Sequence, residues 1–135
     1  MLKAILTALG IRKHDVVEVA WEKRIAEALR DAGYPAQVEV VLGDQSRVDI
    51  LMEHYAVEID WAPKWAESIG QSLYYALRTS RKPAVILLLE AGKHNTLYTT
   101  RALLVAGNLA PKVTVWTFDV ETKVLDMDGA AIQVY

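Results

Sequence analysis

The sequence contains no cysteine among its 135 residues. It therefore has no disulfide framework, no thiolate nucleophile and no thiolate ligand for zinc. Its three histidines, His14, His54 and His94, are widely separated and do not form a cluster with ligand spacing. A structural zinc site is not expected.

The chain also lacks a charge excess and a long apolar run. Its 15 basic and 17 acidic residues give a formal net charge of -2, so contact with nucleic acid would need a local basic patch. The longest apolar run, residues 84–89, is far shorter than the roughly 18 residues that span a bilayer. Residues 1–10 are short for the apolar core of a signal peptide and are predicted to form a packing helix. We therefore expect a cytoplasmic protein with no membrane partner.

The sequence carries the pattern of an α/β domain. After residues 1–10, apolar spacing, caps and breakers predict three helices and five strands, with a further hairpin around Asp128-Gly129. The order α-β-β-β-α-β-α-β, with no repeat or linker, indicates a single domain over residues 1–135 with one mixed β-sheet flanked by helices. The helices are predicted over 15–30, 63–79 and 96–109, and the strands over 36–42, 47–52, 55–61, 85–89 and 112–118.

The second and third predicted strands form a hairpin whose register is informative. A turn centred on residues 53–54 sets Asp49 opposite Glu58 and Arg47 opposite Asp60. Like charges in opposed positions destabilise a hairpin by roughly 0.2 to 1 kcal/mol, and a bound divalent cation removes that cost. A hard, oxygen-liganded ion such as Mg2+ or Mn2+ suits two carboxylates better than zinc. The same register turns four apolar residues to the opposite face: Val48, Ile50, Val57 and Ile59.

Glu18 lies on the apolar side of the first predicted helix. At about 100° per residue it falls between Ile25 and Leu29, inside the stripe expected to be buried. A carboxylate in that stripe needs a partner, because an unpaired buried charge is costly. The predicted metal site is the candidate partner, and Glu22, at the edge of the stripe, is expected to contribute less.

Lys64, Gln71 and Arg78 share one polar face of the second predicted helix, at intervals of seven residues. Lys64 follows Glu58 by only six residues, so a lysine entering from the start of this helix is expected to reach the metal-bound water or a phosphate. Gln71, one repeat later, is expected to orient substrate or water.

These residues resemble the core of the PD-(D/E)xK nuclease superfamily, which has a restriction endonuclease-like fold. The resemblance extends over about residues 18–89 and rests on RVDI at 47–50, AVEIDWAPKW at 56–65 and IGQSLYY at 69–75. It implies that Asp49 and Glu58 bind Mg2+ or Mn2+ and that Glu18 is an outer or third ligand. In recombination-type members, including Holliday junction resolvase-like ones, a glutamine followed by a tyrosine occupies the next helix, as Gln71 and Tyr74 or Tyr75 do here.

The sequence departs from the family at Asp60, which stands where the motif lysine is usual. Lys64 is the candidate replacement. The resulting hypothesis is a metal-dependent deoxyribonuclease in which Asp49, Glu58, Lys64 and Gln71 are catalytic. Its expected partner is DNA, and a homodimer is an expectation from the resemblance. Candidate substrate contacts are Arg78, Asp60 and Tyr74.

Two alternatives remain open at this point. The first is an inactive domain of the same fold that binds nucleic acid or a partner protein, which Asp60 and the slightly acidic charge favour. The second is an unrelated α/β binding domain in which Asp49 and Glu58 are ordinary solvated strand residues. In the same way, Lys64 and Arg78 have the alternative of a solvated helix face, and Glu18 that of a surface ion pair.

Overall fold

The computed structural model describes residues 13–135 and contains one seven-stranded mixed sheet with three α-helices. The α/β prediction with a mixed sheet is confirmed. The helix predicted over residues 1–10 lies outside the described residues. The elements in chain order are α2 (Lys13–Asp31), β1 (Ala36–Val41), β2 (Arg47–Met52), β3 (Tyr55–Trp61), the 3-10 turn η1 (Ala62–Lys64), α3 (Trp65–Thr79), β4 (Lys82–Leu89), α4 (Asn95–Gly107), β5 (Thr114–Asp119), β6 (Val124–Met127) and β7 (Ala130–Gln133).

The strands lie in the sheet in the order in which they occur in the chain. Strands β3, β4 and β5 are parallel, and the pairs β1–β2, β2–β3, β5–β6 and β6–β7 are antiparallel. A parallel pair needs a crossover connection, and α3 and α4 supply the two crossovers. The predicted hairpin at Asp128-Gly129 is present as β6 and β7.

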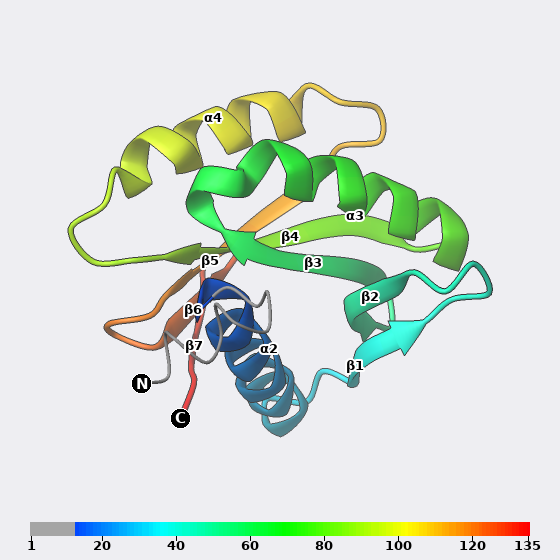
Figure 1. Cartoon of the computed structure of the whole chain (residues 1–135), viewed down its shortest axis with the longest axis horizontal. Coiled ribbons are helices and arrows are strands. Elements are labelled where there is room, and N and C mark those ends of the chain that lie inside the picture. Colours follow the sequence, from blue (N-terminus) through cyan, green and yellow to red (C-terminus); the bar gives the residue numbers. More distant parts are fainter. Residues whose placement is uncertain (1–12) are drawn as a thin grey trace.

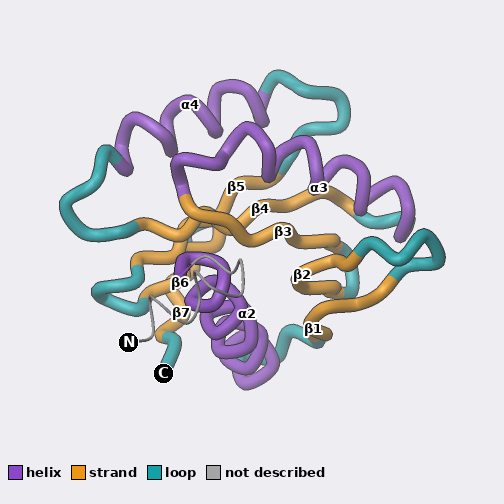
Figure 2. Tube along the Cα trace, in the orientation of Figure 1, coloured by secondary structure: helices purple, strands orange, loops and turns teal. Residues whose placement is uncertain are grey.

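The helices cover the sheet on both faces (Figure 1). Helices α3 and α4 lie on one face and α2 lies on the other, as the tube in Figure 2 also shows. Each face has its own core: Ile25 and Leu29 of α2 pack in one, and Ile69 of α3 with Ala102 of α4 in the other. Strand β4 is buried along residues 83–88 because it is covered on both sides, which explains its unbroken apolar sequence.

The described helices include none that combines the length and the apolar character needed to cross a membrane.

Ser80 closes α3 in the left-handed conformation, with φ 55° and ψ 42°, and its N–H donates to the Ala76 carbonyl. Glycine is the preferred residue there because it has no Cβ to strain the backbone. Ser80→Gly is expected to raise the free energy of unfolding by about 0.5 kcal/mol, since relief of that strain exceeds the added freedom of the unfolded chain. Urea denaturation would measure it. Ala66→Gly, at an exposed position of the same helix, is the control and should lower stability.

Candidate metal centre

The site is built where β2 and β3 separate. The two strands pair through Ile50 with Val57 and Leu51 with Ala56, which confirms the predicted register. One residue beyond this pairing, Asp49 Oδ2 accepts a hydrogen bond of 2.8 Å from the backbone N–H of Ile59. A side-chain carboxylate therefore takes the place of a ladder partner at this position.

The predicted pairing of Arg47 with Asp60 is wrong. In the described sheet the β2–β3 ladder ends before these residues, and Arg47 pairs instead with Val41 of β1. Its guanidinium contacts Glu39 Oε2 at 3.2 Å. Asp60 is buried and accepts a hydrogen bond of 2.8 Å from the Trp61 N–H. The hairpin opens because β1 holds the start of β2 while the Asp49 carboxylate occupies the Ile59 N–H.

Asp49 and Glu58 form a buried, hydrogen-bonded pair of acids. Glu58 is 7% exposed and its side chain donates a hydrogen bond to the Asp49 carboxylate. Burial raises the pKa of both groups, and the neighbouring Asp49 charge raises that of Glu58 further. The second oxygen of Glu58, Oε2, is buried without a hydrogen-bond partner. The pair is thus a desolvated acidic group with one oxygen still to be satisfied.

Helix α2 brings two more carboxylates to this pair. Glu22 is 2% exposed, and its Oε1 is buried with no hydrogen-bond partner. Burial first, and then the charges of Asp49, Glu39 and Glu18, raise the pKa of Glu22 to about 8. Glu18 is half-buried and lines the same cleft. The sequence predicted that both glutamates lie near the site and that Glu18 is the more buried of the two. In the structure Glu22 is the buried one.

These groups open into a cleft of about 300 Å³ between the start of α2, the outer strands and α3. Tyr75 of α3 closes one side of it. The pKa of Tyr75 is raised by burial and then by the Glu58 and Asp49 charges, so its hydroxyl stays protonated beside the acids. The resemblance named Tyr75 only as an alternative to Tyr74, and it missed Glu39 altogether. The residues along the cleft are Glu18, Val19, Glu22, Glu39, Arg47, Asp49 and Tyr75.

Two of the predicted contacts lie near the β1–β2 turn. The Tyr74 hydroxyl donates to the Asp44 carboxylate, and the Arg78 guanidinium lies beside Gly43. Hydrogen bonds from Ser46, and then the charge of Arg78, lower the pKa of Asp44. These contacts tie the turn to α3 and so position the start of β2, which carries Arg47.

Lys64 and Gln71 lie outside this cleft. Lys64 lines a second cleft at the end of β3, and Gln71 is exposed on α3 one turn before Tyr75.

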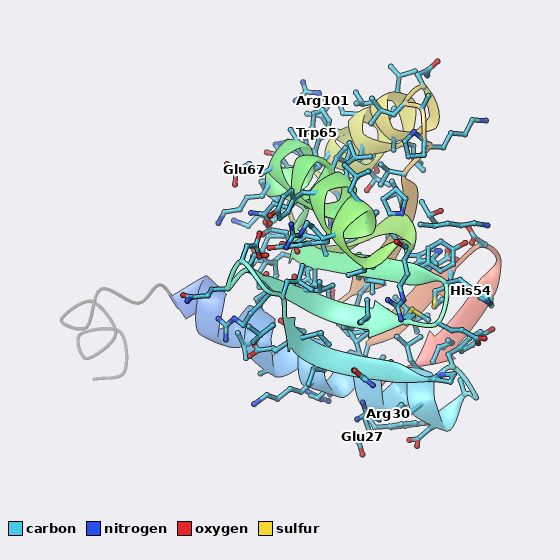
Figure 3. All side chains as sticks on the ribbon, turned by 90° about the vertical axis from the view of Figure 1, so that its right-hand side faces the viewer. Glu27, Arg30, His54, Trp65, Glu67 and Arg101 are labelled. Atoms are coloured by element: carbon cyan, nitrogen blue, oxygen red, sulfur yellow. The ribbon has the colours of Figure 1, made fainter. Side chains whose placement is uncertain are left out.

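The side chains in Figure 3 place His54 at the β2–β3 turn, on the side of the molecule opposite to the start of α2. His54 is also well exposed, as expected for a surface residue.

The donor atoms of the cleft suit a hard divalent cation. Four carboxylates line it, those of Glu18, Glu22, Glu39 and Asp49, and two carboxylate oxygens, Glu22 Oε1 and Oε2 of the adjoining Glu58, are buried without a hydrogen-bond partner. Within residues 13–135, no three acidic or histidine side chains already stand in the spacing of a metal cage. The cleft therefore offers the ligand chemistry that a hard divalent cation prefers.

Comparison with protein-family models, with curated proteins and with solved structures gives no match to this chain.

Proposed function

We propose that the protein is a metal-dependent nuclease that hydrolyses DNA phosphodiester bonds, with a fold of the PD-(D/E)xK type. The observation that carries the proposal is the buried Asp49–Glu58 pair at the opening of the β2–β3 hairpin, beside the orphaned oxygen of Glu22. A fold gains nothing from concentrating desolvated carboxylates unless a cation or a proton compensates them. The choice of DNA as substrate rests on the resemblance.

In this proposal Asp49 and Glu58 hold Mg2+ or Mn2+, and Glu22 and Glu18 complete or orient the ligand set. The bound cation would supply positive charge that polarises the phosphate and lowers the pKa of water. The hydrogen bond from Ile59 N–H fixes one Asp49 oxygen, and a bound cation would replace the hydrogen bond between Asp49 and Glu58. Tyr75 remains a neutral hydrogen-bond donor at the edge of the cleft.

Arg47 supports the phosphate-binding role better than Lys64 does. Among the residues described along the acidic cleft, Arg47 is the basic one, and its side chain is 61% exposed despite the contact with Glu39. Such exposed ion pairs are weak, so the guanidinium can exchange Glu39 for a phosphate at little cost. Arg78, near the β1–β2 turn, extends this basic edge. Lys64 faces the second cleft instead.

The second candidate function is a domain of this fold that binds DNA or a protein without cutting. Asp60 favours it, because an acid held by the Trp61 N–H occupies the position of the family's motif lysine. The two functions differ in one measurable property, which is cleavage that depends on a divalent cation.

The test is cleavage of end-labelled single-stranded, duplex and branched DNA by the purified protein in Mg2+ or Mn2+, beside the same reactions in EDTA. The proposal expects products with either metal and none in EDTA. Metal binding without any cleavage product would favour the second candidate function, which is binding of DNA or a protein without cleavage. Equal cleavage with and without metal would refute the metal-dependent mechanism.

A further inference from the structure

A second cleft lies at the carboxyl ends of the parallel strands β3 and β4, and it shares no lining residue with the acidic cleft. Its volume is about 350 Å³, near the lower end of ligand pockets and suited to one small molecule. Crevices outside the carboxyl ends of parallel strands are common ligand sites in α/β proteins. Nothing in the proposed nuclease chemistry uses this cleft.

The floor and one wall of this cleft are apolar and aromatic. Leu88 is fully buried and Trp61 is 6% exposed, so both are fixed by the core beneath them. Tyr98, in the first part of α4, is half-buried and offers a ring that a planar group can stack on or contact at its edge. A flat aromatic ligand fits this wall better than a sugar or a peptide would.

The rim of this cleft is basic. Lys64 and Lys93 stand against a single acid, Glu90, which gives the lysines and the acid together one excess positive charge. The Lys93–Glu90 contact is 3.9 Å long and exposed, so it competes weakly with a ligand phosphate. His94 and Asn95 add polar groups at the start of α4, whose first turn has no acidic residue. The rim therefore attracts an anion, in contrast to the acidic cleft.

We propose that this cleft binds a nucleoside monophosphate, with the base against Tyr98 and Trp61 and the phosphate between Lys64 and Lys93. The same chemistry is presented by a free nucleotide and by the phosphorylated terminal nucleotide of a strand. The cleft is placed and charged to hold either one without a metal ion. Lys64 is then a ligand-binding residue of this cleft and not a substitute for the motif lysine.

The test is isothermal titration calorimetry, in which adenosine 5′-monophosphate is added to the protein in the presence of EDTA. Saturable binding is expected, with adenosine and ribose 5-phosphate each binding at least about tenfold more weakly because each lacks one half of the ligand. Lys64→Met and Lys93→Gln should each weaken binding about tenfold. Lys82→Gln, an exposed lysine at the opposite end of β4, is the matched control and should leave binding unchanged.

The Asp49→Asn variant separates this inference from the proposed function. It should bind the mononucleotide as the wild type does, whether or not the wild type cuts DNA. Tighter binding of a 5′-phosphorylated dinucleotide than of the mononucleotide would identify a strand end as the ligand, and the reverse order would identify the free nucleotide. No saturable binding of either ligand, or binding that Asp49→Asn abolishes and Lys64→Met leaves intact, would overturn the proposal.

Discussion

Asp49→Asn is expected to lower the rate of metal-dependent DNA cleavage at least about a hundredfold while preserving the fold. The amide oxygen of asparagine can still accept the Ile59 N–H, so the opening of the β2–β3 hairpin is retained. What is lost is a negative charge that a cation needs, and even supporting residues of metal sites change affinity or activity by about 10- to 100-fold. The substitution also removes a charge that disfavours ionisation of Glu58 and Glu22.

Glu53→Gln is the matched control for this prediction. Glu53 lies at the exposed turn of the same hairpin. Its substitution also removes one negative charge, but at a position away from Asp49 and Glu58. Cleavage rates in saturating Mn2+ and thermal melting in EDTA would be measured for all three proteins. Cleavage at the wild-type rate by Asp49→Asn, with Glu53→Gln also active, would rule out Asp49 as a metal ligand.

The register of the β2–β3 hairpin could be predicted because two independent signals agree on it. The turn at residues 53–54 fixes which positions face each other, and the alternation of Val48, Ile50, Val57 and Ile59 fixes which face is buried. All four of these side chains are fully buried. Local sequence determined this feature, and it is the feature on which the proposed site depends.

The positions of Lys64 and Tyr75 depend on packing that sequence spacing does not contain. Pro63 lies in the 3-10 turn η1 after β3, and Lys64 at the end of that turn lines the second cleft. Tyr75 reaches the acidic cleft because α3 crosses back over the sheet, a path set by the contacts of Ile69 with the core. Neither the direction of a short turn nor the crossing of a helix follows from residue intervals.

The order of Glu18 and Glu22 was predicted wrongly for a related reason. Glu18 and Glu22 are four positions apart in the helix, so their side chains differ in direction by about 40° around the helix axis. A projection of that kind identifies the buried side of α2 correctly, as Ile25 and Leu29 confirm. It does not say how the helix is rotated against β1 and β2, and that rotation decides which glutamate lies beneath the surface.

The metal-free protein is expected to lose stability as the pH rises from 5 to 8. Burial and neighbouring acids raise the pKa of Glu22 from 4.5 to about 8 in the folded state, so between these values the folded protein binds more protons than the unfolded chain. The free energy of unfolding therefore falls with pH across this window. At about 1.4 kcal/mol per pH unit, one such group accounts for a loss on the order of 3 kcal/mol by pH 7.5, and Glu58 acts in the same direction.

Glu22→Gln should reduce this pH dependence, leaving the part that comes from Glu58, and make the variant more stable than the wild type at pH 8. The amide is neutral at every pH, so the folded state no longer has to keep a proton on this side chain or bury its charge. Glu27→Gln, at an exposed position one and a half turns further along α2, is the control and should follow the wild type. Urea denaturation in EDTA at pH 5, 6.5 and 8 would measure the three proteins. Wild-type stability that stays level or rises over this range would mean that Glu22 is ionised in the fold, and the acidic cleft would then already compensate its charge without a cation.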